Sequence, residues 1–171
     1  MAGSLIKIDE EIVTSAVASI SLVGIDSTYD VYMVRFNNVT PDTDAVNCYF
    51  RVTKSGTADT TANYNIAAKY LKSYTTFSNA FATNDTKFNF TEFGTGTSES
   101  TNGILYLFNF ANASEYSFVT FEEQHIGSVQ NHLGYQGGLV HTVASASDGV
   151  NFSTSSGNIA SGTFTLYGLK K

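Results

Sequence analysis

Three histidines and one cysteine are the side chains of this sequence best suited to bind a metal or to act as base and nucleophile. His125, His132 and His141 are too far apart in the sequence to form a local metal-binding motif, and no HxH, HExxH or cysteine-containing ligand motif occurs. A metal held on a three-fold axis by one histidine from each of three chains stays open. Cys48 has no second cysteine to pair with and lies in a strand-like segment, so we expect an inert core thiol.

The acidic residues offer no paired carboxylates of the kind that cleave glycosidic bonds. Glu122 and Glu123 are adjacent, as are Glu10 and Glu11, and adjacent residues of a strand point to opposite faces. A glycosidase needs two carboxylates on one bond, about 5–10 Å apart. No G-x-S-x-G elbow, phosphate-binding loop or dinucleotide fingerprint occurs either. The sequence therefore predicts a protein that is not an enzyme, with no catalytic residue and no cofactor.

One turn could hold calcium. Asp42 and Asp44, with Asn38 and Asn47 nearby, offer oxygen ligands of the type that Ca²⁺ prefers. The same residue types also form ordinary turns by accepting hydrogen bonds from backbone amides, and Pro41 presets a turn here. The sequence favours the turn and leaves calcium as the alternative.

Charge excludes several classes of partner. The chain has 171 residues, 14% of them charged, and a formal net charge of −6. Its nine Lys and Arg are too few to replace phosphate counterions, so we expect no binding to nucleic acid or to anionic membranes. No signal-peptide pattern occurs, and no apolar run approaches the roughly 20 residues of a membrane span. We expect a protein that stays in the cytoplasm where it is made.

The pattern along the chain is that of an all-β protein. Tyr and Phe make up 13% of the residues, and Ser, Thr, Asn and Gly are abundant, which suits strands joined by turns. Turn signals recur about every 8–12 residues, as in a sandwich or barrel. The segments that we predict as strands are Leu5–Ile8, Val17–Ile25, Tyr29–Asn37, Val46–Thr53, Phe88–Phe93, Ile104–Phe110, Tyr116–Glu122, Gly138–Ala146, Val150–Thr154 and Gly162–Leu169.

The remaining segments are less regular. Asn63–Tyr74 fits both a helical stripe and strand alternation, and we prefer the strand. Gly94–Gly103 has no apolar residue and should be an exposed loop. Asp148-Gly149 lies between two strand-like runs and predicts a hairpin there. Gly157 and Gly162 permit positive φ on either side of Ile159, which can then turn into the core as a plug.

Together these elements predict a single domain over residues 1–171, an all-β antiparallel two-sheet β-sandwich that is jelly-roll-like, with a barrel as the alternative. The Phe residues and most Tyr residues should fill its core. A surface of tyrosines that stacks on sugars is the competing use of these rings, although Trp is absent.

Several short motifs resemble a β-sandwich module of virion structural proteins from tailed bacteriophages, especially marine ones. The matching pieces are Tyr29-Asp30-Val31-Tyr32, the turn Asn37–Asp44, Tyr49–Thr53 with Ser55-Gly56, Ala62-Asn63-Tyr64 and, most clearly, the ending Ser155–Leu169. The match extends over most of the chain, but its motifs are short and built of common residues. It is therefore moderately specific for a phage particle component and does not distinguish which component.

The resemblance implies a protein that is made in the host bacterium and displayed on the exterior of the virion, on the head surface or in a tail fibre or appendage. It implies self-association, as a homotrimer, and contacts with other virion proteins such as the major capsid protein or tail components. Because the module starts almost at Met1 with no upstream shaft, we favour capsid decoration over a tail fibre. A receptor- or carbohydrate-binding module at a fibre tip is the alternative. The ligand-binding and oligomer-interface residues are left unknown.

Overall fold

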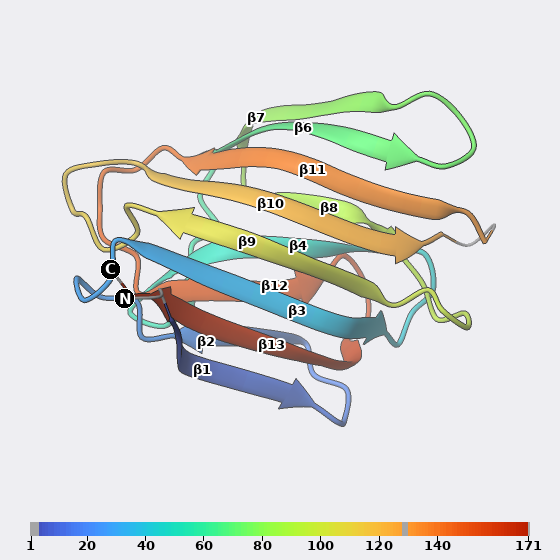
Figure 1. Ribbon diagram of the computed structural model, residues 1–171, viewed down its shortest axis with the longest axis horizontal. Helices are drawn as coiled ribbons and strands as arrows, with labels where there is room; N and C mark the ends of the chain where they lie inside the picture. The colour runs from blue at the N-terminus through green and yellow to red at the C-terminus, as the bar shows by residue number, and fades with distance from the viewer. Residues whose placement is uncertain (1–3, 128–129, 171) are drawn as a thin grey trace.

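A computed structural model describes residues 4–127 and 130–170. These residues form no helix; they form two antiparallel sheets packed as a sandwich, which confirms the predicted fold class (Figure 1). The strands are β1 (Leu5–Val13), β2 (Ser19–Val23), β3 (Val31–Pro41), β4 (Val46–Lys54), β5 (Thr57–Ala58), β6 (Tyr64–Lys72), β7 (Ser78–Asp85), β8 (Phe88–Phe93), β9 (Thr101–Phe108), β10 (Ser117–Ile126), β11 (His132–His141), β12 (Gly149–Thr154) and β13 (Ile159–Leu169).

Eight of the strands pair in the nested order of a jelly roll. β1 pairs with β13, β2 with β12, β3 with β9 and β4 with β8, so that one long antiparallel ribbon is wound across both sheets. The smaller sheet has the order β2-β12-β4, with β5 and β8 both pairing β4. The larger sheet has the order β1-β13-β3-β9-β10-β11-β6-β7. Its last four strands are an extension of the jelly roll, formed by two insertions in the chain.

The core is a layer of aromatic rings between the two sheets. Phe36 of β3 lies 5.8 Å from Phe152 of β12, ring centre to ring centre, and Phe152 lies 5.1 Å from Phe164 of β13. All three rings are buried, and tilted contacts of this kind are the favourable geometry for aromatic pairs. The jelly-roll strands are thus joined by dense packing across the sandwich.

Most predicted strands are present. The ambiguous segment Asn63–Tyr74 forms β6, and Ile104–Phe110 and Tyr116–Glu122 correspond to the neighbours β9 and β10. At the end of the chain, both glycines have positive φ (68° at Gly157, 144° at Gly162), and Ile159 is fully buried as the predicted plug.

The predicted hairpin at Asp148-Gly149 is wrong, because β11 and β12 lie in different sheets. Asp148 instead ties strands together: its carboxylate accepts a hydrogen bond from Thr53 Oγ1 at 2.7 Å and another from Gly56 N at 2.8 Å. A Cβ on Gly149 would lie 2.1 Å from the carbonyl oxygen of Leu22. The glycine therefore allows close approach of β12 and β2, and it does not form a turn.

One other prediction needs correction, and one strand is absent from the predicted set. The segment Gly94–Gly103 is not wholly an exposed loop, because β9 begins at Thr101 and the Glu99 side chain is buried, with its Oε2 accepting a hydrogen bond from Gly96 N at 2.9 Å. The edge strand β7 was not predicted, because its residues are mostly small and polar. Their alternation gave no apolar face to recognise.

A buried polar network joins the extension to the jelly roll. The ring of His141 of β11 packs against Tyr64 of β6 in a tilted contact, and its Nε2 lies 3.2 Å from the Asp59 carboxylate. Burial alone would raise the pKa of Asp59, but hydrogen bonds from Thr61 and the ammonium group of Lys54 outweigh burial and lower this pKa to about 2. Burial lowers the pKa of His141, and the nearby Asp59 charge opposes this only in part. The network is therefore built for an ionised Asp59 and a neutral His141.

Acidification should weaken the fold through His141. Below its ordinary pKa of 6.5 the unfolded chain takes up a proton that the folded protein, with its lower pKa at His141, does not. The stability due to the neutral ring should be fully present above pH 6.5 and should fall as the pH drops from 6.5 towards the folded-state pKa. The slope is at most about 1.4 kcal/mol per pH unit, the limit for one proton. Urea unfolding between pH 7 and pH 5 measures it.

The variant His141→Phe keeps a ring on Tyr64 and removes the titrating group, so its stability should depend less on pH over this range. His132→Gln replaces an exposed histidine outside this buried network and is the matched control. A slope unchanged by His141→Phe would contradict the assignment.

Candidate interaction surface

The outer face of the larger sheet is the surface most suited to bind something. Strand side chains alternate, so β9 and β10 each turn one set of residues into the core and the other outwards. On these two strands the outward set includes exposed apolar residues, namely Ile104, Tyr106 and Phe118. An apolar, aromatic stripe on a solvent-facing sheet is unusual, because such faces normally carry polar side chains.

Strand pairing aligns the outward residues in rows across the sheet. One row is largely apolar, with small residues on β10, β11 and β6, and runs through Lys7, Tyr167, Met33, Tyr106, Thr120, Gly138, Ala67 and Phe81. The neighbouring row is polar and runs through Glu10, Thr165, Arg35, Ile104, Glu122, Gln136, Lys69 and Asn79. The outer face is thus amphipathic along the strand direction.

Small residues in the first row leave the face hollow over β11 and β6. We call this hollow the trough and define it by Ala67, Thr120, Gln136, Gly137 and Gly138. Three adjoining depressions make it up, of about 580, 560 and 390 Å³. Gly137 is required by the backbone here, because an added Cβ would lie 2.4 Å from the carbonyl oxygen of Ala67.

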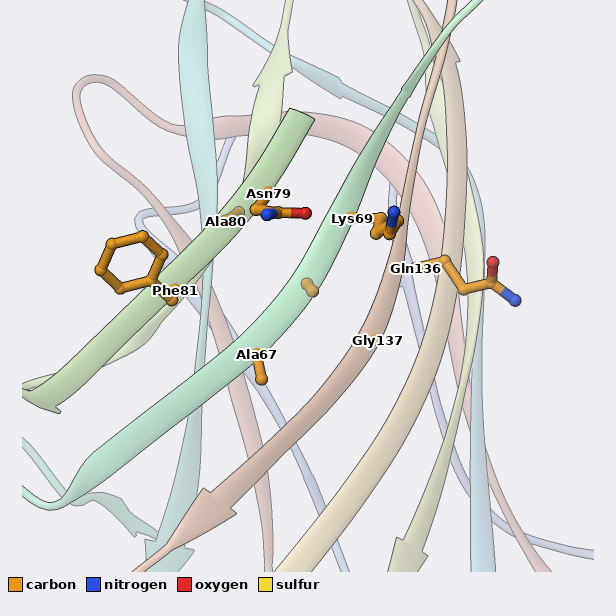
Figure 2. A pocket seen from close by; sticks show the side chains of 8 residues that line it. Ala67, Lys69, Asn79, Ala80, Phe81, Gln136 and Gly137 are labelled. Atoms are coloured by element: carbon orange, nitrogen blue, oxygen red, sulfur yellow. The ribbon is translucent and has the colours of Figure 1, made fainter. Parts of the chain in front are cut away.

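The two walls of the trough differ. On one side Tyr106 and Phe118 rise from β9 and β10, and on the other Phe81 rises from β7. Figure 2 shows Lys69, Asn79 and Gln136 near the trough and the Phe81 ring beyond β7, pointing away from Ala67. Phe81 therefore lies at the rim of the sheet and does not fill the trough.

Charge on the outer face is balanced, unlike that of the whole chain. Lys7, Arg35 and Lys69 lie in these two rows against Glu10 and Glu122, whereas the chain carries −6 in total. Gln136 Nε2 donates a hydrogen bond to Glu122 Oε1 at 2.9 Å, and Lys7 pairs with Glu10 at 3.1 Å. A second protein surface can approach this face without the repulsion that the acidic remainder would exert.

The structure keeps the three histidines apart. His125 is buried with its Nδ1 2.8 Å from Glu123 Oε1, which also accepts a hydrogen bond from Thr101 Oγ1. His132 is exposed, and His141 belongs to the network around Asp59. In residues 4–127 and 130–170 no three His, Cys, Asp or Glu side chains converge to hold a metal ion.

The other predicted residues have structural roles. Glu122 points outwards and Glu123 into the core, as expected for neighbours on a strand. Cys48 is buried in β4, and burial together with the charge of Glu123 raises the pKa of its thiol, which keeps the thiol protonated. Residues 4–127 and 130–170 contain no helix that is long and apolar enough to cross a membrane.

Asp42 and Asp44 face different backbone amides. Asp42 Oδ1 accepts a hydrogen bond from Asn158 N at 2.7 Å and its Oδ2 accepts one from Asn158 Nδ2 at 2.8 Å, whereas Asp44 Oδ1 accepts one from Thr95 N at 3.1 Å. The hydrogen bond from the Asn158 backbone, followed by the one from its side chain, lowers the pKa of Asp42. These donors lie 116 and 51 residues away in the sequence, so the two carboxylates connect the turn to distant segments of the chain, and the choice between turn and calcium stays a prediction.

The comparisons with known proteins give no further assignment. The chain matches no family model, and no curated protein matches it in sequence. The sequence predicts none of the outer-face residues as a site, although the exposed Tyr and Phe of β9 and β10 form the second set of an alternating pattern.

Calcium should leave the turn at Asp42 unaffected. Because both Asp42 oxygens already accept hydrogen bonds from Asn158, adding Ca²⁺ or a chelator should not move the melting temperature. Asp42→Ala removes these bonds and should lower the melting temperature by about 2–4 °C, with or without Ca²⁺, as for a lost loop cap in a domain of this length. Differential scanning calorimetry measures both. A calcium-dependent rise that Asp42→Ala abolishes would establish the calcium alternative instead.

Proposed function

We propose that this protein is a non-enzymatic structural component of a tailed-phage virion, displayed on the exterior of the particle and associated with further copies of itself. The resemblance of the ending Ser155–Leu169 and the other short motifs supports the phage assignment. The jelly-roll fold is in keeping with it, since this fold is common in viral coat proteins, although the same fold also serves lectins and enzymes.

The charge-balanced, aromatic outer face is the observation that carries the proposal. A structural virion protein must form large contacts with neighbouring proteins. The centres of such contacts consist of aromatic and uncharged groups, and their rims are polar. Tyr106 and Phe118 provide the aromatic groups, and the row through Arg35 and Glu122 provides the rim. The neighbours that we propose are the major capsid protein or tail components, with capsid decoration favoured and a trimer implied by the resemblance.

Purified particles of the phage that encodes this chain should contain the protein. Immunogold labelling with antibodies against it should decorate the particle, and mass spectrometry should detect its peptides after the particles have been washed at high salt. Labelling of the head supports decoration, and labelling of the tail supports the appendage version. Absence of the protein from washed particles would refute the proposal.

One specific observation favours a second candidate, binding of a glycan. Tyr106 lies in the same depression as Glu122 and Gln136, so that an aromatic ring stands beside hydrogen-bonding groups. Carbohydrate is commonly bound by an aromatic ring that packs on one face of a sugar, together with polar groups that form hydrogen bonds with the sugar hydroxyls. A fibre-tip module would use the trough in this manner.

The glycan candidate predicts binding to an array of host-surface glycans, at a level that falls at least tenfold in Tyr106→Ala. Tyr116→Ala removes a similarly exposed ring that does not line the depression, and it should bind like the wild type. A wild-type protein that binds neither the array nor host cells would exclude this candidate and leave the structural proposal standing.

A further inference from the structure

We infer that two copies of this chain join edge to edge, by antiparallel pairing of β7 with β7 of the second copy across a two-fold axis at Phe81. The inference deepens the proposed function, on whose self-association it rests, by naming the strand and the partner. It starts from the two edges of the larger sheet.

The two edge strands of this sheet are built differently. β1 carries Lys7, Asp9, Glu10 and Glu11, and its pairing with β13 is interrupted by a bulge between Lys7 and Asp9. Charges and bulges are the means by which proteins stop edge strands from pairing with other chains. The β1 edge is therefore protected.

The β7 edge has none of these features along most of its length. From Ser78 to Thr83 it has no charged residue and no proline, and its register with β6 is regular from Ser78 to Ala82. Protection begins only at the end of the strand, where Asn84 has a φ of 55° and Asp85 adds a charge. A regular, neutral edge strand is a template for another strand.

β7 is also poorly covered by the rest of the fold. The larger sheet extends past the smaller one, so that only the partly buried Ala80 and Ala82 of β7 pack against the core. Phe81 is 84% exposed, and Phe77 and Tyr74 just before the strand are 59% and 55% exposed. These three rings lie within eight residues of the chain, beside the unprotected edge.

The sequence of β7 is nearly palindromic about Phe81. In an antiparallel pair centred on this residue, Phe81 faces its own copy, Ala80 faces Ala82, and Asn79 faces Thr83. Each position therefore meets a side chain of its own kind: aromatic with aromatic, methyl with methyl, polar with polar. Such cross-strand pairs stabilise sheets, and a two-fold contact requires this self-complementarity. This pattern identifies a second copy as the occupant of the edge.

Charge and area agree with this occupant. Two copies that each carry −6 repel, and the neutral stretch Ser78–Thr83 lets their backbones meet without a like-charge contact. A Phe or Tyr side chain buries about 150–250 Å², so the exposed parts of Tyr74, Phe77 and Phe81 amount to roughly 400 Å² per copy. With the strand backbone added, the contact reaches about 1,000 Å², where specific interfaces begin.

Size-exclusion chromatography with light scattering, over a range of concentrations, tests the inference. A two-fold contact gives two copies of 18.4 kDa, or six copies if the three-fold contact implied by the resemblance also forms. A mass of two or six copies supports the β7 contact. A monomer at every concentration, or a mass of three copies, overturns it.

Phe81→Asp places two carboxylates opposite each other at the axis and should halve the mass, from two copies to one or from six to three. Ile12→Asp makes the same change at a residue 61% exposed on the opposite edge strand, and should leave the mass as in the wild type. Cooperative melting of both variants checks that they are folded. Equal effects of the two substitutions would overturn the inference.

Cysteine cross-linking tests the register independently. Opposed residues of an antiparallel pair have Cα atoms about 4.5–5.5 Å apart, within reach of a disulfide. Oxidised Phe81→Cys should therefore run as a covalent dimer on a non-reducing gel, and Asn79→Cys mixed with Thr83→Cys should cross-link between chains. Ile12→Cys is the control, and the native Cys48 is buried and does not compete. If Phe81→Cys forms no more dimer than Ile12→Cys, the inference is wrong.

The two proposals fail separately. A protein that is found on washed particles but shows no β7 contact leaves the virion assignment standing. A protein that dimerises through β7 but is absent from particles refutes the virion assignment and leaves the contact.

Discussion

The unequal size of the two sheets is the constraint on which the surface of this protein depends. Eight strands pack against a smaller sheet, and the aromatic layer around Phe36 and Phe152 fills the space that the two sheets share. Beyond β9 the larger sheet continues through β10, β11, β6 and β7, where cover from the smaller sheet decreases (Figure 1). Side chains there are stabilised by fewer neighbours, so small residues and exposed rings accumulate on the extension and its edge.

The sequence predicted the parts of the fold that follow from alternation. In β6, the inward set Tyr64, Ile66, Ala68 and Tyr70 marked a strand, because period two puts these residues on one face. β7 was missed because its inward residues are alanines, which carry little hydrophobic contrast. Asp148-Gly149 misled because a dipeptide that favours a hairpin also suits a strand that must approach its neighbour closely. A local sequence pattern cannot distinguish a glycine in a hairpin turn from one that allows two strands to approach closely. The distinction depends on which strand packs beside the glycine.

The buried polar contacts show more clearly that local sequence patterns do not predict which distant residues meet. His141 and Asp59 lie 82 residues apart in the sequence and meet only because β11 pairs with β6. Glu123 and His125 are neighbours on one strand, but their burial depends on the sheet that covers them. Residue types and spacing could show that the histidines do not form a local metal motif. They could not show that His125 and His141 each contact a carboxylate in the interior, since that information is contained in the strand order.

The trough and the β7 edge adjoin each other, since Phe81 borders both, and the geometry of a sheet relates them. A two-fold axis that pairs β7 with its copy stands perpendicular to the sheet, so the outer faces of both copies point the same way. Two troughs would then lie on one continuous face. A partner with repeated sites, such as a particle surface or a glycan layer, could engage both troughs at once, and the second contact would form at high effective concentration. Pairing at the edge would thus strengthen whatever the outer face binds.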